Sequence, residues 1–276
     1  MQLDIFDDAR QKRKQLLAIF ETLPTTTVHG VVGANGPSGG KVPPELHWSL
    51  NMNLIAWRIP GSPIHNTQLL VSKIVSDEEL HTLQSSITSE SIVAFRGKLC
   101  ENSPFGDTRA QLFDLLDRPS DNELELILSQ FRQPVEIVDP VVGRMALNKS
   151  VNWFEGKITW LGKQIDIAVS VDDKGTPTDS LQTAKTLLGA MEQWANRVND
   201  YAVGELLKLK NDNWLSEEES PISREEFINR MQLNSITAYP DGDFDFWHHD
   251  GDLFWGHAIQ VSGSLSEGLT HADIAG

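Results

Sequence analysis

The feature that most constrains the fold is a long row of apolar residues with helical spacing in the second half of the chain. Its members recur at steps of three or four residues and therefore share one face of a helix. They are Leu181, Ala184, Leu188, Met191, Ala195, Val198 and Ala202, with Leu187, Trp194 and Tyr201 in an adjoining row. Such a wide apolar face has to be buried against a second layer of structure. The sequence therefore predicts one long amphipathic helix that follows Pro177 and packs on a sheet.

Segments with the alternation of β-strands lie on both sides of this helix. The expected strands are Met145–Asn148, Lys157–Trp160, Gln164–Val171, Ser235–Tyr239, Asp243–His248, Leu253–Val261 and Leu269–Ile274. In the segment Leu253–Val261, alternation predicts that Leu253, Trp255, His257, Ile259 and Val261 share one face, which we expect to be buried against the helix. The order meander, helices, meander predicts an α+β domain with the helices on one face of an antiparallel sheet.

The first half of the chain predicts a second small α+β domain. We expect a helix over residues 3–22, a mobile Gly- and Pro-rich loop over 29–44 and a helix that contains Leu112–Leu116. Two capping boxes, Ser76–Glu79 and Ser120–Glu123, predict further helix starts. The expected strands are Ser49–Arg58, Gln68–Ile74 and Ile92–Leu99. Two prolines and a glycine in Pro134–Gly143 predict a junction, with domains at 1–139 and 140–276.

The charge of the chain restricts its partners. The net charge is −16, and the halves 1–139 and 140–276 carry 12 and 11 basic against 18 and 21 acidic side chains. This balance argues against binding to nucleic acids and to anionic membranes. The sequence has no apolar run as long as the roughly 18–20 residues of a membrane span and no signal-peptide core, so we expect a cytoplasmic protein. The single cysteine, Cys100, excludes an intramolecular disulfide and a zinc site built from cysteines.

The segment Phe244–Gly276 is the most distinctive part of the sequence, with the core DGDLFWGH at 250–257. Together with NWFEGKITWLGKQIDI at 152–167 and LKNDNWL at 209–215, it resembles a bacterial family catalogued as domain of unknown function 2262. The resemblance covers roughly residues 140–276. It implies no established activity and no catalytic residues. Similar small acidic α+β families are often encoded beside bacterial toxins and act as immunity proteins, and this context is what the resemblance implies here.

The polar and aromatic residues of this segment are the candidate site: Trp247, His248, His249, Asp250, Asp252 and His257. The metal-ligand alternative uses His248, His249, Asp252 and His257, because imidazole and carboxylate suit zinc, manganese or iron. Adjacent side chains on a strand point to opposite faces, so His248 and His249 reach one ion only if the turn bends them. In the structural interpretation, Asp250 and Asp252 accept hydrogen bonds from turn amides, and His257 is a hydrogen-bonded, half-buried sheet residue.

Two functions from different classes follow from these patterns. The first is a protein-binding module, an immunity protein that neutralises a bacterial effector toxin, for which we predict no catalytic residues and no cofactor. The acidic charge and the lack of a coherent catalytic constellation favour it. The second is a metal-dependent hydrolase that uses the His/Asp cluster at 248–257 to activate a water molecule.

Overall fold

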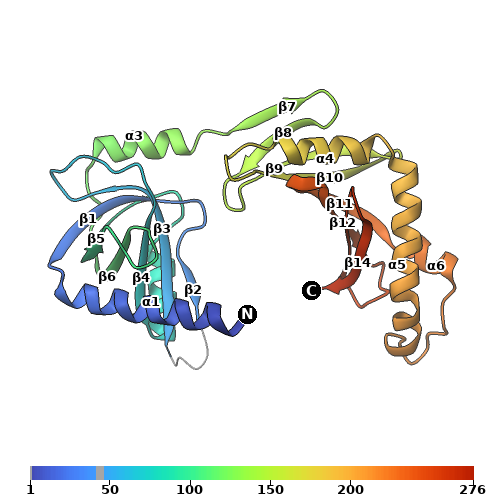
Figure 1. Ribbon diagram of the computed structural model, residues 1–276, viewed down its shortest axis with the longest axis horizontal. Coiled ribbons are helices and arrows are strands. Elements are labelled where there is room, and N and C mark those ends of the chain that lie inside the picture. The colour runs from blue at the N-terminus through green and yellow to red at the C-terminus, as the bar shows by residue number, and fades with distance from the viewer. Residues whose placement is uncertain (1, 42–46) are drawn as a thin grey trace. The chain divides into compact units, whose positions relative to one another are not determined.

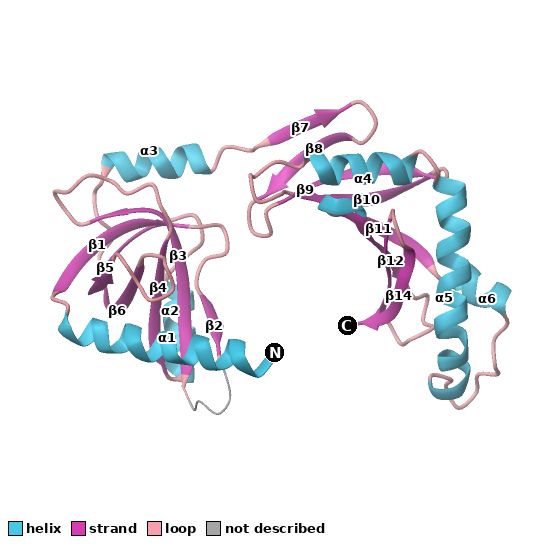
Figure 2. Ribbon diagram, viewed as in Figure 1, coloured by secondary structure: helices cyan, strands magenta, loops and turns pink. Residues whose placement is uncertain are grey.

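The chain folds into two compact units, Met1–Gln133 and Pro134–Gly276. A computed structural model describes residues 2–41 and 47–276. Each unit combines a sheet with helices (Figures 1 and 2), which confirms the α+β class predicted from the sequence. The sequence predicts a first domain that ends at residue 139, whereas the strand Glu136–Asp139 pairs within the sheet of the second unit.

The first unit is a small barrel with three helices among its described residues. Strand β1 pairs with β5 on one side and with β3 on the other, so the order β1-β5-β6-β4-β3 closes on itself. The third barrel strand, β4, runs parallel to the fifth, β6, and α2 lies between the third and fourth strands. This is the connectivity of an OB-type barrel. The elements are α1 (Gln2–Thr22), β1 (Thr25–Val32), β2 (Ser38–Gly40), β3 (Trp48–Arg58), β4 (Leu69–Val75), α2 (Asp77–Ser86), β5 (Ile92–Cys100), β6 (Arg109–Leu116) and α3 (Asn122–Phe131).

Apolar side chains from the barrel strands fill the interior. They include Val28, Leu50, Leu54, Trp57, Leu69, Val71, Phe95 and Leu112, all buried. Leu16 and Phe20 of α1 pack with Cys100 at the end of β5, so the only cysteine is a buried core residue. The pairing of β5 with β6 shifts its register at Gly97, where a Cβ atom would lie 2.0 Å from the carbonyl oxygen of Gln111.

Three expectations for the first unit need correction. Leu112–Leu116 belongs to strand β6 and not to a helix, because pairing with β5 and β4 decides between two periods that a short apolar run satisfies equally. Residues 29–32 are the end of β1 and not part of a loop, and residues 42–44 of that expected loop lie outside the described residues. The cap of α3 is Asp121 and not Ser120.

The second unit is built on an open sheet with the strand order β14-β13-β12-β11-β10-β9-β8-β7. Neighbouring strands are antiparallel except β10 and β11, because three helices form the crossover between those two strands. The elements are β7 (Glu136–Asp139), β8 (Gly143–Asn148), β9 (Trp153–Trp160), β10 (Lys163–Ser170), α4 (Thr178–Leu188), α5 (Met191–Asn213), α6 (Arg224–Arg230), β11 (Gln232–Ala238), β12 (Asp243–His249), β13 (Ala258–Ser264) and β14 (Gly268–Ala275), with a short turn of 3-10 helix at Pro240–Gly242.

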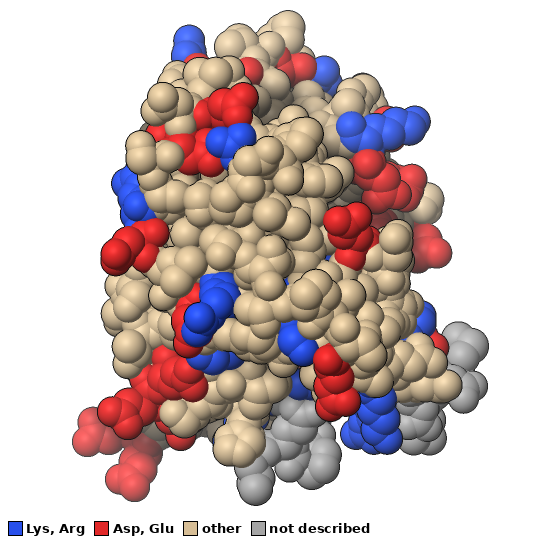
Figure 3. Space-filling model, turned by 90° about the vertical axis from the view of Figure 1, so that its left-hand side faces the viewer, with Lys and Arg blue, Asp and Glu red and all other residues tan. Residues whose placement is uncertain are grey.

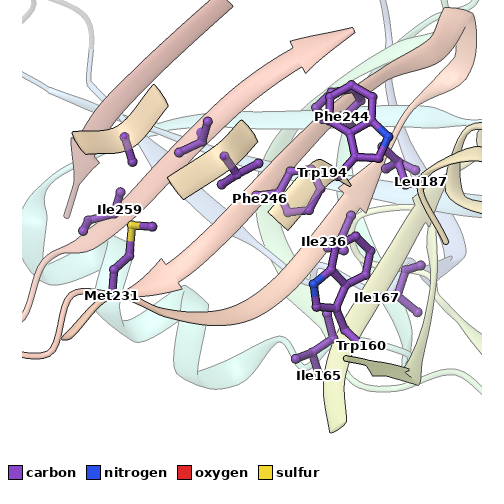
Figure 4. Close-up of a cluster of buried hydrophobic side chains, with 14 of the residues drawn as sticks. Trp160, Ile165, Ile167, Leu187, Trp194, Met231, Ile236, Phe244, Phe246 and Ile259 are labelled. Atoms are coloured by element: carbon purple, nitrogen blue, oxygen red, sulfur yellow. The ribbon is translucent and has the colours of Figure 1, made fainter. Parts of the chain in front are cut away.

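The apolar row from Leu181 to Ala202 packs on this sheet as expected, but its residues belong to two helices and not to one. The chain breaks its helical course at Gly189 and Ala190, between α4 and α5. Ala184, Val198 and Ala202 are buried against the sheet. Figure 4 shows how Leu187 and Trp194 of these helices lie among Trp160, Ile165, Ile167, Ile236, Phe244 and Phe246 of the strands. The helices therefore cover one face of the sheet, and the site lies where their far end meets the loop between β12 and β13.

Candidate functional site

Residues 250–257 form a compact loop between β12 and β13, organised by the buried carboxylate of Asp250. Its Oδ2 accepts hydrogen bonds from the backbone N–H of Phe254 at 2.7 Å and of Gly256 at 3.1 Å, and its Oδ1 accepts one from Asp252 at 3.2 Å. The prediction that Asp250 satisfies turn amides is therefore confirmed. Asp252 is exposed and contributes its backbone to the loop, so for Asp252 that prediction is wrong.

The expectation of a continuous strand over Leu253–Val261, with Trp255 buried, is wrong. Strand β13 begins only at Ala258. Leu253 and Phe254 are consecutive and both fully buried, whereas Trp255 is 63% exposed. The alternation of buried and exposed side chains holds only for an extended backbone. Here the carboxylate of Asp250 accepts hydrogen bonds from three backbone amides of the loop, so the backbone is not extended. Trp255 consequently has a φ of +58°, a left-handed conformation that bulky side chains rarely adopt.

Gly251 is required by the packing of this loop. It has a φ of +55°, and a Cβ atom there would lie 2.4 Å from the carbonyl oxygen of Arg230 at the end of α6. Only glycine combines that backbone conformation with so close an approach. Asp250 and Gly251 therefore have different roles in the loop. The carboxylate of Asp250 accepts hydrogen bonds from backbone amides, and the absence of a side chain at Gly251 allows the loop to contact α6.

Trp255 contacts a second tryptophan at the end of α5. The rings of Trp214 and Trp255 lie 4.8 Å apart between centroids, and Trp214 also meets Phe254 and His257 edge-on, each at 5.6 Å. We call Trp214, Trp255 and His257 the aromatic surface. Trp214 and His257 are half-buried and Trp255 is exposed. The exposed ring of Trp255 therefore packs against a half-buried ring, that of Trp214.

An ion pair between the fully buried Lys210 and the half-buried Glu219 supports both sides of the aromatic surface. Lys210 is fully buried, and its Nζ donates to the carbonyl oxygen of Trp214 at 2.7 Å and to Glu219 at 2.6 Å. Arg230 donates to the other oxygen of Glu219 at 2.9 Å and to the carbonyl oxygen of Gly251 at 2.9 Å. Hydrogen bonds from Lys210 and from Arg230 lower the pKa of Glu219 to about 2. Glu219 therefore stays ionised and links the end of α5 to the loop.

Acidic residues lie close in sequence to the two tryptophans of the aromatic surface. Glu217 and Glu218 follow Trp214 by three and four residues and are exposed. Asp252, also exposed, lies three residues before Trp255 in the same loop. Glu219 pairs with the two cations Lys210 and Arg230. Three exposed acidic residues therefore lie on the two segments that carry the tryptophans.

Two family comparisons bear on this geometry. Residues 139–274 match the family described as Uncharacterized protein conserved in bacteria (DUF2262). The second unit belongs to this family. The resemblance of the DGDLFWGH segment is thereby confirmed, and we refer to residues 134–276 as the DUF2262 unit. Residues 12–131 match the family described as Domain of unknown function (DUF7021), and no curated protein matches the chain.

The remaining candidate residues of the DUF2262 unit are not brought together. His248 is buried on the helix side of β12, where burial lowers its pKa to about 4, while His249 is exposed. Trp247 is half-buried and lines a shallow depression with Trp153. Since His248 and His249 point to opposite faces of β12, the turn does not bend them toward one ion. Among the described residues, no three His, Cys, Asp or Glu side chains are placed to hold a metal ion.

Sequence reasoning missed the residues that support the loop: Lys210, Trp214, Glu219 and Arg230. A signal for Lys210 was available, because Val198, Ala202 and Leu206 precede it at steps of four on the buried face of α5. A lysine that continues an apolar row predicts a buried carboxylate partner. No comparable pattern marks Glu219, which lies in a loop nine residues later.

Proposed function

We propose that this chain is a protein-binding module and that the aromatic surface of the DUF2262 unit is its recognition element. The observation that carries the proposal is Trp255, an exposed tryptophan with a left-handed backbone. Such a conformation costs on the order of 1–3 kcal/mol and persists where the surrounding structure imposes it, often at binding sites. Here Asp250 imposes it through three backbone hydrogen bonds.

The geometry suits the centre of a protein interface. Tryptophan is enriched among the residues that carry most of the binding energy in such interfaces. Trp255 is oriented before binding by its contact with Trp214, so little side-chain freedom remains to be lost on association. Because Trp214 and His257 are already half-buried, Trp255 is the aromatic side chain that can enter a pocket on the partner.

The charge around this surface favours a basic partner. Glu217, Glu218 and Asp252 are exposed on the two segments that carry the tryptophans, and the chain as a whole carries −16. Complementary charge steers association and suppresses acidic competitors. In its most specific form, the proposal is that the partner is a bacterial effector toxin and that the chain is its immunity protein in the cytoplasm. The resemblance given above supports this specific form.

The first unit gives less support to a nucleic acid as the partner. OB-type barrels bind oligonucleotides on the outer face of their second and third strands, where cations and aromatic rings are needed. Seven outward residues of β3 and β4 here are uncharged: Ser49, Asn51, Asn53, Ile55, Leu70, Ser72 and Ile74. Arg58, at the end of β3, is already paired with Asp121 and Glu123. In the view of Figure 3, Lys and Arg lie among Asp and Glu without a continuous basic patch on the described residues drawn there.

The described part of the chain also has no helix long and apolar enough to cross a membrane.

Affinity capture from the native host tests the proposal. The tagged full chain should recover one dominant basic protein, and Trp255→Ala should reduce that recovery at least tenfold, as the loss of a central interface tryptophan does. Leu126→Ala is the control, because Leu126 is also exposed but lies on α3 of the first unit. If the captured protein is a toxin, co-expression of the wild-type chain should restore growth, and Trp255→Ala should not.

Two outcomes would refute the proposal. If capture recovers no protein and the chain protects against no product of a neighbouring gene, the binding function is wrong. If a partner is recovered equally by the wild type and by Trp255→Ala, the chain binds proteins through another surface.

A further inference from the structure

A pocket of about 210 Å³ lies between the helices and the sheet of the DUF2262 unit, apart from the aromatic surface. Residues of α5 and α6 form one side of it, and residues of β9 to β12 form the other. Its apolar interior consists of buried side chains: Trp160, Ile165, Val198, Met231 and Phe246. Trp160 and Phe246 meet edge-on, with 5.6 Å between their ring centroids (Figure 4). The interior of the pocket is therefore apolar and partly aromatic.

The mouth of the pocket is formed by residues that reach solvent. Leu161, Lys163 and Gln232 are exposed, and Asn199 and Ile228 are half-buried. An apolar interior with a few polar groups at its mouth is typical of sites that bind small molecules. A cavity of about 150 Å³ already accommodates benzene, so one substituted aromatic ring fits here.

The strand register places Lys163 on the side of the sheet that faces this pocket. Lys163 begins β10 directly opposite Trp160 of β9. Residues that oppose each other on neighbouring strands point to the same face, so the lysine side chain projects beside the buried tryptophan. Within the described part of the chain, Lys163 forms no ion pair and no hydrogen bond, whereas Lys185 and Lys210 each pair with a carboxylate. Its amine is therefore available to a ligand at the mouth of the pocket.

The charge of the lining restricts the ligand. The described lining residues include no acidic side chain. His248 also lines the pocket, but burial lowers its pKa to about 4, so it is neutral near pH 7. Lys163 is then the one charged group among the described lining residues. A carboxylate on the ligand would accept a charge-assisted hydrogen bond from its Nζ, whereas an amine would meet a like charge.

We propose that this pocket binds a single-ring aromatic carboxylate, with the ring among Trp160, Val198 and Phe246 and the carboxylate paired with Lys163 at the mouth. The binding is independent of the proposed recognition of a protein, because it uses none of the residues of the aromatic surface. Neither proposal depends on the outcome of the other.

The probes that test this proposal are para-methylbenzoate, the neutral para-methylbenzyl alcohol and the cationic para-methylbenzylamine, which share the methylated ring and differ in charge. Titration of the full chain, followed by NMR of the side-chain methyl groups, should shift the signals of Ile165, Val198 and Met231. The affinity should fall in the order carboxylate, alcohol, amine. The carboxylate should bind about threefold more tightly than the alcohol, the size of effect expected for an exposed ion pair.

Three variants locate the binding. Lys163→Met should remove the preference for the carboxylate over the alcohol, and because Lys163 is exposed this variant should fold. Lys208→Met is the matched control, since Lys208 is an exposed lysine of α5 outside the pocket, and it should keep the threefold preference. Ala195→Phe should weaken the binding of all three probes by filling the pocket.

The proposal is overturned if para-methylbenzoate leaves the three methyl signals unshifted or if the alcohol or the amine binds at least as tightly. It is also overturned if Lys163→Met retains the preference for the carboxylate. The NMR titration needs only the wild-type chain, so it decides the question even if Ala195→Phe does not fold.

Discussion

The two units bury the apolar side chains of their sheets in different ways. The first closes its sheet, since β1 pairs with both β3 and β5, and its inward side chains fill one interior. The DUF2262 unit leaves its sheet open, covers one face with α4 and α5, and ends at β7 and β14. A closed barrel removes its edges, whereas an open sheet has to protect them. The open arrangement also leaves room for a pocket under α5 and for the loop that presents Trp255.

Two buried carboxylates show the same contrast on a smaller scale. Asp121 of the first unit caps α3 through the N–H of Leu124, and Arg58 donates to both of its oxygens, at 2.6 and 2.8 Å. The described partners of Asp250 are three backbone amides and no cation. Asp121 therefore fixes the end of a helix within a charge pair, whereas Asp250 sets the path of an entire loop. The conformation of the loop at 250–257 therefore depends on the hydrogen bonds of one carboxylate, and substitutions can test this dependence.

The largest effect is expected at Glu219, on which the support of this loop converges. Glu219→Gln removes the charge that compensates the fully buried Lys210 and weakens the contact with Arg230. Breaking a buried ion pair on one side costs about 3–5 kcal/mol. Urea unfolding should show a loss of this size, whereas the exposed neighbour Glu217→Gln should change stability by less than about 0.5 kcal/mol. Equal small effects would mean that Lys210 finds another partner.

The same residue predicts a pH dependence for the DUF2262 unit. The pKa of Glu219 is about 2 in the folded chain and 4.5 ordinarily, so the unfolded state binds the proton more tightly. Its contribution to stability is complete above about pH 4.5 and is lost as the pH falls toward 2. Hydrogen exchange of amides in the DUF2262 unit, measured across this range, should show the loss, and Glu219→Gln should remove that part of it. An unchanged acid profile in the variant would contradict this assignment.

The paired substitutions Asp250→Ala and Asp121→Ala test the comparison of the two carboxylates. Asp250→Ala leaves three amides without their acceptor and should destabilise the chain by about 3 kcal/mol. Asp121→Ala removes a helix cap and should cost about 1–2 kcal/mol, because Arg58 keeps Glu123 as a partner. Thermal unfolding of both variants measures the difference. If Asp121→Ala is the more damaging, the loop has support that the hydrogen bonds do not reveal.

Two strand glycines, one in each sheet, provide a further comparison of the two units. Gly97 in the barrel and Gly156 in the open sheet both lie against a carbonyl oxygen of the neighbouring strand, at 2.0 and 2.7 Å from an added Cβ. Gly97→Ala should cost about 2–3 kcal/mol and Gly156→Ala about 1 kcal/mol, since the closer contact is to backbone in a closed barrel that yields less. Chemical denaturation of the two variants provides the test. Equal costs would show that closure does not stiffen the first sheet.

The sequence predicted the parts of this structure that depend on periodicity. The apolar row from Leu181 to Ala202 does pack on a sheet, and the capping box at Ser76 does begin α2. Strand pairing was not predictable in this way, because closure through β1 and β3 joins residues about 30 positions apart, such as His29 and Arg58. Leu112–Leu116 was placed in the wrong element for the same reason.

The candidate site shows a different limit. The composition of the segment 247–257 drew attention to the right region, but alternation placed Trp255 in the core, where Phe254 lies instead. The error arose because a single buried carboxylate overrides the extended backbone, and its three amide partners become visible only once the loop is folded. The support from Glu219 reaches the loop through Arg230 of α6, a connection that no local pattern specifies.

The most direct test of this account compares Phe254→Ala with Trp255→Ala. We claim that the loop buries Phe254 for stability and displays Trp255 for binding. Urea unfolding should show a loss of about 3–5 kcal/mol for Phe254→Ala, which empties a fully buried site, and of less than about 1 kcal/mol for Trp255→Ala. A loss of several kcal/mol for Trp255→Ala, with Phe254→Ala tolerated, would show that Trp255 is the core residue and would contradict the account.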